Sequence, residues 1–96
     1  MENAKELLSE YINSVEKILV EFSYDENSAI TRLEELKKKL SVKHSVEKEF
    51  EELFSACVYN ALAAINSSVC QTRKSDQLIA FLTEAKEEMR EISAMM

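Results

Sequence analysis

Residues 56–65 read ACVYNALAAI, and Asn60 is the one strongly polar residue among them. A helix that is apolar on nearly every side needs neighbours on every side, so this segment indicates a buried helix. It is much shorter than the roughly 20 apolar residues that span a bilayer. We therefore expect a helix over Val46–Asn66, capped by Ser45, at the centre of a soluble helical bundle. Its expected inward residues are Val46, Phe50, Leu53 or Phe54, Cys57, Ala61, Ala64 and Ile65.

The composition agrees with an all-helical fold. The 96-residue chain contains no glycine and no proline. Without glycine, the positive φ angles of tight hairpins and phosphate-binding loops become costly, and without proline nothing interrupts a helix. We predict a single all-α domain over residues 1–96, of a size that supports one hydrophobic core.

Three further helices follow from apolar spacing. The first is predicted to begin at Asn3, which caps it with the help of Glu6, and to end near Ser23. Its inward positions step by three and four: Ala4, Leu8, Tyr11, Val15, Ile18 and Phe22. The second begins near Ser23 or Asp25 and buries Ile30, Leu33, Leu36 and Leu40. The last begins after a Ser75 cap and buries Leu78, Leu82, Ala85, Met89, Ile92 and Met96.

Short polar connections are expected at Ser41–Ser45 and from Asn66 to Asp76. Four helices joined in this way predict an antiparallel four-helix bundle with up-down-up-down order. One alternative stays open, because Val69 continues the spacing of the third helix. The last two helices would then form one long helix, which exposes an apolar seam and requires dimerisation.

Charge and cysteine content narrow the function. A formal net charge of −6 argues against nucleic-acid binding and against more than peripheral contact with anionic lipid. The charged N-terminal residues do not resemble a signal peptide. Cys57 and Cys70 lack C-x-x-C spacing, and on one helix they would stand about 20 Å apart. These features predict a reduced, cytoplasmic protein that is a monomer or a homodimer.

Catalytic and metal-binding patterns are not evident in the sequence. His44 is the single histidine, no Glu-x-x-His motif occurs, and we expect His44 to be a solvated loop residue. Cys57 reads as a small core residue, and no nucleophile has a recognisable base beside it. An acidic face on the last helix, formed by Glu84, Glu87, Glu88 and Glu91, reads as a solvated surface. We predict a protein without enzymatic activity, cofactor or metal.

One basic cluster departs from the acidic average. It surrounds the second connection, at the end of the bundle expected to hold both termini, and Arg73 and Lys74 are expected at the opposite end. Dipole compensation and solubility explain such a cluster without any partner. The functional interpretation is a patch that recognises an anionic protein surface, with Lys38, Lys39, Lys43, His44 and Lys48 as its partner-binding residues.

The segments Phe50–Leu62 and Asp76–Lys86, with the polar connection between them, resemble the immunity proteins that protect bacteria from pediocin-like bacteriocins (the enterocin A immunity family). The resemblance lies in helix lengths, loop placement and leucine and alanine spacing. It implies a cytoplasmic protein that recognises a bacteriocin-occupied sugar transporter at the inner face of the membrane. Two other interpretations stay open: an acidic phage-type inhibitor of a nucleic-acid-processing complex, and a homo-oligomeric scaffold or secretion chaperone.

Overall fold

The computed structural model describes residues 2–71 and 75–96. Four α-helices and one short 3-10 helix make up this part of the chain: α1 (Ala4–Glu21), α2 (Glu26–Ser41), η1 (Lys48–Phe50), α3 (Glu51–Gln71) and α4 (Ser75–Met95). The described residues include no β-strand, and one isolated bridge joins Glu2 to Val46. The all-α prediction is therefore confirmed.

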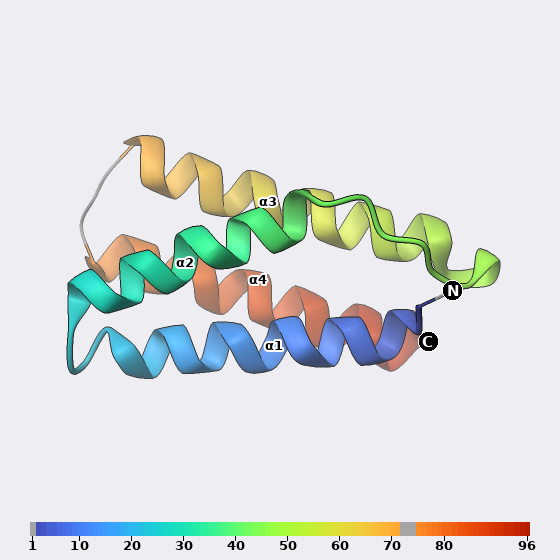
Figure 1. The fold of residues 1–96 in the computed structure, drawn as a ribbon, viewed down its shortest axis with the longest axis horizontal. Helices are drawn as coiled ribbons and strands as arrows, with labels where there is room; N and C mark the ends of the chain where they lie inside the picture. The colour runs from blue at the N-terminus through green and yellow to red at the C-terminus, as the bar shows by residue number, and fades with distance from the viewer. Residues whose placement is uncertain (1, 72–74) are drawn as a thin grey trace.

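The helices pack as neighbours around a common core. α1 packs against α2 and α4, and α3 packs against α4 and α2. Figure 1 shows them side by side along the longest dimension of 38 Å, with the two chain ends at the same end of the molecule. Because α3 and α4 are separate helices that pack against each other, the alternative of one long fused helix does not hold.

Local capping explains where α1 and α2 begin. The Asn3 side chain accepts a hydrogen bond from the Glu6 amide at 3.0 Å, as the sequence predicted. Asp25 caps α2 by accepting from the amides of Asn27 and Ser28, which selects Asp25 over Ser23 as its cap. Hydrogen bonds from the Ser28 hydroxyl and amide hold the pKa of the Asp25 carboxyl below its usual value. α4 begins at Ser75 itself, so the residue in its cap position lies outside the described residues.

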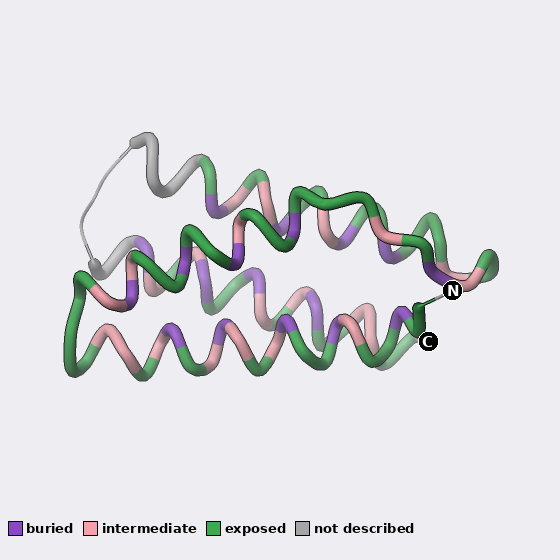
Figure 2. The backbone as a smooth tube through the Cα atoms, in the orientation of Figure 1, coloured by how far each residue is buried: buried purple, intermediate pink, exposed green. Residues whose placement is uncertain are grey.

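The core consists of inward residues from all four helices. The predicted stripe of α1 is buried through Ile18, and Phe22 packs half-buried against the core. α2 buries Ala29 together with its three leucines, and Ile30 is half-buried. The buried residues described in α3 and α4 are Phe54, Cys57, Ala61, Ile65, Leu78, Leu82, Ala85 and Met89. The tube in Figure 2 shows this as purple bands on the inward side of each helix.

The predicted start of the third helix is wrong. Ser45 does not cap a helix, since Val42–Glu47 forms an irregular segment that runs from α2 to η1 beside the N-terminus (Figure 1). The Ser45 carbonyl accepts from the Glu2 amide at 2.7 Å, and the Glu47 carboxylate accepts from the Ala4 amide at 3.0 Å. These residues therefore serve the N-terminus of α1, a tertiary role that local spacing does not reveal.

The predicted end of this helix is also wrong, whereas its predicted inward residues are confirmed: Val46, Phe54, Cys57, Ala61 and Ile65 are buried, and Phe50 and Ala64 are half-buried. α3 continues through Gln71, so most of the expected polar connection is helical. Its burial is one-sided rather than complete. Ala61 is buried and Ala64 half-buried, whereas Leu53, Ala56, Tyr59 and Ala63 are exposed. The central position assigned to this helix does not hold, because α3 is one of four helices at the perimeter of the shared core (Figure 1).

Among the described residues, none of the helices combines the length and the apolar character needed to cross a membrane.

Candidate functional site

The predicted partner-binding residues are distributed along the molecule. Lys38 and Lys39 lie in the last turn of α2, Lys43 is exposed in the irregular segment, and Lys48 is exposed in η1. The six residues between α2 and η1 span up to about 20 Å. Within the described part of the chain, none of these four lysines forms an ion pair. Arg73 and Lys74, expected at the opposite end, fall outside the described residues.

His44 is not the solvated loop residue that the sequence predicted. It is half-buried, and its Nε2 is hydrogen-bonded to the hydroxyl of Tyr11 on α1. The imidazole also packs edge-on against Tyr11 and Phe54, with ring centroids 5.8 Å and 5.3 Å away. His44 therefore fastens the irregular segment to α1 and α3, and its side chain is part of the packing instead of an open recognition surface.

Lys39 belongs to a different site, a groove between α1 and α2. Its central recess has a volume of about 190 Å³ and is lined by Ser14, Lys17, Ile18, Arg32, Glu35, Leu36 and Lys39. Adjoining recesses that share Lys17 extend the groove toward Glu10 and Tyr11 in one direction and toward Val20 and Glu21 in the other. On α1 this length corresponds to about 16 Å of helix.

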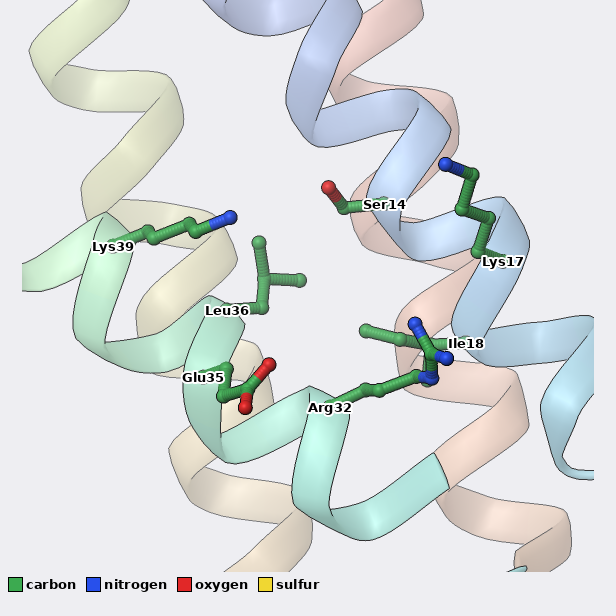
Figure 3. Close-up of a pocket in the computed structure, with 7 residues that line it drawn as sticks. All are labelled: Ser14, Lys17, Ile18, Arg32, Glu35, Leu36 and Lys39. Atoms are coloured by element: carbon green, nitrogen blue, oxygen red, sulfur yellow. The ribbon is translucent and has the colours of Figure 1, made fainter. Parts of the chain in front are cut away.

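Buried apolar side chains form the floor of this groove, and exposed charges form its rim. Ile18 and Leu36 are 2% exposed, whereas Lys17, Arg32 and Lys39 are exposed. Figure 3 shows the Lys39 side chain extending from α2 toward Ser14, and the Arg32 guanidinium reaching toward Ile18 on α1. Cations from two helices therefore border one apolar strip.

The charges at the centre of the groove are only partly balanced. Arg32 lies 4.0 Å from the Glu21 carboxylate, a long contact between two solvent-accessible groups. Glu35 is the single carboxylate lining the central recess, against three cations. Elsewhere among the described residues, one close ion pair joins two helices, where Arg90 of α4 bonds Glu16 of α1 at 2.5 Å. The central recess is thus locally positive in a chain whose net charge is −6. The adjoining recesses add Glu10, Glu16 and Glu21, so the groove as a whole has four carboxylates against the same three cations.

The cysteine and the carboxylates outside the groove form no further reactive or metal-binding site among the described residues. Burial, with a smaller contribution from Glu88, raises the pKa of the Cys57 thiol to about 12, so this thiol stays protonated near neutral pH. On α4, Glu84, Glu87 and Glu91 are exposed, while Glu88 accepts a 3.0 Å hydrogen bond from Asn60. In the described part of the chain, no three His, Cys, Asp or Glu side chains are grouped so as to hold a metal ion.

Sequence reasoning assigned Lys39 to recognition but missed Lys17 and Arg32. Both follow from helical register: each is one residue from a core position, next to Ile18 on α1 and Leu33 on α2. Charged residues that flank the stripes of two adjacent helices face a common groove, although the sequence does not state which helices are adjacent. No protein-family model matches the chain, and comparison with curated proteins and with solved structures likewise finds no match.

Proposed function

We propose that this chain is a non-enzymatic, cytoplasmic protein-binding domain that recognises an acidic helix of a partner protein through the groove between α1 and α2. An antiparallel up-down-up-down bundle is the proposed scaffold. The observation that carries the proposal is the placement of Lys17, Arg32 and Lys39 around the apolar floor of Ile18 and Leu36.

The form of the groove favours a polypeptide over a small ligand. Its central recess of about 190 Å³ is smaller than the roughly 300–1,000 Å³ of typical small-molecule pockets, and the adjoining recesses of about 310 and 390 Å³ lie at the low end of that range. The groove also continues along the helices instead of closing around one point. Helix-in-groove recognition uses this arrangement, in which apolar anchors occupy the floor and charges along the rim set orientation.

The spacing of the basic residues along α2 indicates how the acidic residues of the partner helix should be spaced. Arg32 and Lys39 are seven residues apart on α2, about 10.5 Å along the helix axis. Carboxylates seven residues apart on a partner helix have the same separation, and small apolar residues between them would face Ile18 and Leu36. Since exposed ion pairs contribute about 0–1 kcal/mol each, binding should be moderate and should weaken with salt.

Bacteriocin immunity is the specific activity that we propose for this domain, on the strength of the resemblance in Phe50–Leu62 and Asp76–Lys86. The acidic helix would then belong to the transporter complex at the inner face of the membrane. The immunity activity and the groove can be tested separately, because the groove can be assayed with a synthetic peptide.

Two charge-matched triple variants test the groove. The groove variant carries Lys17→Glu, Arg32→Glu and Lys39→Glu, and the control variant carries Lys38→Glu, Lys43→Glu and Lys48→Glu. Each reverses three charges and takes the net charge from −6 to −12. Both should fold, because all six residues are exposed.

The probe is a synthetic amphipathic peptide with glutamates seven residues apart and alanine or leucine between them. The parent and the control variant should bind it, and the groove variant should lose at least about tenfold in affinity. An equal loss of peptide affinity in both variants would show that net charge, and not the groove, determines binding. Loss in the control alone would assign recognition to the lysines around the irregular segment.

The immunity activity has its own assay. Each version is expressed in a bacteriocin-sensitive strain, and survival is measured across a panel of pediocin-like peptides. We expect protection by the parent against at least one peptide and its loss in the groove variant. Failure of the parent to protect against every peptide would refute the immunity activity while leaving the peptide-binding result intact.

A further inference from the structure

The end of the groove near Val20 differs chemically from its centre. The recess there has a volume of about 390 Å³ and is lined by Glu16, Lys17, Val20, Glu21 and Arg32, and we refer to it as the Val20 recess. Val20 is 58% exposed. Among the large apolar residues exposed in the described part of the chain, it is the one that lines the groove recesses. An exposed valine is ordinary on a protein surface, but one that lines a recess can receive a partner side chain.

The charges in the Val20 recess are balanced within the chain. Two carboxylates, Glu16 and Glu21, stand against the two cations Lys17 and Arg32. Glu16 is bonded to Arg90 of α4, and Glu21 lies 4.0 Å from Arg32. A partner carboxylate would gain no net attraction here and would meet two like charges, whereas an apolar side chain would remove apolar surface from water. The Val20 recess therefore suits an apolar residue of the partner instead of an acidic one.

The opposite end of the groove offers no equivalent position. Its recess is lined by Glu10, Tyr11, Asn13, Ser14, Lys17 and Lys39. Tyr11 is the one of these with an apolar ring, and it is 4% exposed with its hydroxyl bonded to His44. The other five side chains are polar or charged. An apolar residue of the partner is therefore accommodated at one end of the groove, which gives the bound helix a defined register.

The Val20 recess is continuous with the central recess, because Lys17 and Arg32 line both. The partner residue that meets Val20 and the carboxylate that meets Arg32 must therefore be neighbours. On a helix, neighbours on one face are three or four residues apart, with Cβ atoms about 5–6 Å from each other.

We propose that the partner helix carries a leucine-sized apolar anchor in the Val20 recess, three or four residues outside the carboxylate that meets Arg32, an assignment that rests on the proposed function of the groove. Arg32 and Lys39 attract any helix with suitably spaced carboxylates, so charge alone discriminates poorly among acidic helices. Val20 is then the residue that determines specificity, because it selects the acidic helices that also carry the anchor.

Fluorescence anisotropy with two labelled peptides tests the anchor. Both peptides have glutamates seven residues apart with alanine between them, and they differ at one position four residues outside one glutamate, which is either leucine or alanine. Because the two glutamates can exchange places on Arg32 and Lys39, the leucine can reach Val20 whichever glutamate it flanks. With the parent, leucine should raise affinity about threefold to tenfold over alanine. With Val20→Gln, the two peptides should bind equally.

Val42→Gln is the matched control, since Val42 is 62% exposed and lines none of the three groove recesses. Both variants should fold, because both valines are exposed. Val42→Gln should keep the full preference for leucine. A preference that survives Val20→Gln, or that is absent in the parent, overturns the anchor while the peptide-binding function of the groove stands. Failure of both peptides to bind the parent overturns that function and the anchor with it.

Photo-cross-linking locates the anchor directly. A peptide with a photoreactive leucine analogue at the anchor position should label residues 16–21 of α1, which include the carboxylates and the valine of the Val20 recess. Mass spectrometry identifies the labelled residues. Labelling concentrated at the opposite end of the groove, around residues 10–14, would overturn the proposed register.

Discussion

His44 joins three parts of the molecule through one side chain. Its Nε2 meets the hydroxyl of Tyr11, a residue that is 4% exposed, and its ring packs against Phe54. A buried hydroxyl without a partner costs about 1–3 kcal/mol, and an edge-on aromatic contact contributes about 0.5–1.5 kcal/mol. His44 therefore contributes more to the stability of the fold than is usual for a residue in an irregular segment.

Replacement of His44 should therefore destabilise the fold. His44→Ala is expected to lower the free energy of unfolding by about 2–3 kcal/mol in urea titrations, since it removes both the hydrogen bond and the ring contacts. His44→Phe keeps the packing and should lose less. The adjacent and exposed Lys43→Ala should stay within about 0.5 kcal/mol of the parent. Equal midpoints for His44→Ala and Lys43→Ala would contradict this role.

The raised pKa of the Tyr11 hydroxyl predicts that the free energy of unfolding falls at alkaline pH. Burial raises the pKa of Tyr11 from 10.0 to about 12, with smaller contributions from Glu2 and Glu10. The neutral phenol is favoured in the folded state, so this contribution is complete below pH 10 and disappears as pH rises from about 10 to 12. Tyr11→Phe should be less stable than the parent at pH 8, and the difference should shrink by pH 11.5. A difference that stays constant across this range would contradict the assignment. The raised pKa of the Cys57 thiol also lowers stability at alkaline pH, but it does so equally in the parent and in Tyr11→Phe, so it cancels in the difference between them.

α3 shows what helical spacing does and does not reveal at the scale of an element. Apolar stripes identified the inward residues of α1, α2 and α4, because each stripe stands beside a polar face. In α3 the spacing identified the inward residues too, but the helix has no charged residue over most of its length, so the same reasoning also expected it to be buried on every side. The structure buries the side of Phe54, Cys57, Ala61 and Ile65 and exposes the other. Hydrophobicity alone does not distinguish a helix covered by its own chain from one with a face left for a partner.

Substitutions at two alanines can distinguish the buried side of α3 from its exposed side. Ala61 is 2% exposed, and Ala63, two residues later, is exposed. Ala61→Glu should place an unpaired charge in the core, at a cost of several kcal/mol against a total of about 5–15 kcal/mol. Ala63→Glu should leave the thermal midpoint nearly unchanged. Circular dichroism at low protein concentration makes the comparison, and cooperative melting of Ala61→Glu at the parental temperature would show that α3 is wrongly placed.

At the scale of the whole molecule, charge opposes compaction. The chain carries 18 acidic and 12 basic residues, and the ion pairs among the described residues lie at the solvent-accessible surface. Net self-repulsion of this kind is screened by salt, since the Debye length falls from about 30 Å at 0.01 M to 8 Å at 0.15 M. The favourable surface pairs are screened as well, but each contributes little.

The melting temperature should therefore rise with sodium chloride. We expect an increase of a few degrees between 0.01 M and 0.3 M, equivalent to about 1 kcal/mol or less for a domain of this size. The triple variant with Lys38, Lys43 and Lys48 changed to Glu, at a net charge of −12, should melt lower and gain more from salt. Chloride is preferred to sulfate, because sulfate stabilises proteins by a different route. A parental melting temperature that falls with salt would show that attractive pairs outweigh the net charge.

The bond from the Ala4 amide to Glu47 spans 43 residues of the chain, and this separation has a consequence for synthesis on the ribosome. At about 5–20 residues per second, Glu47 is added roughly 2–9 seconds after Ala4. A helix of the length of α1 forms and melts within about a microsecond, so throughout that interval its first turn can form only without this acceptor. The same delay applies to the Glu2–Ser45 bond. The nascent chain therefore completes the beginning of α1 only when the segment between α2 and α3 has emerged, which couples its earliest residues to its middle.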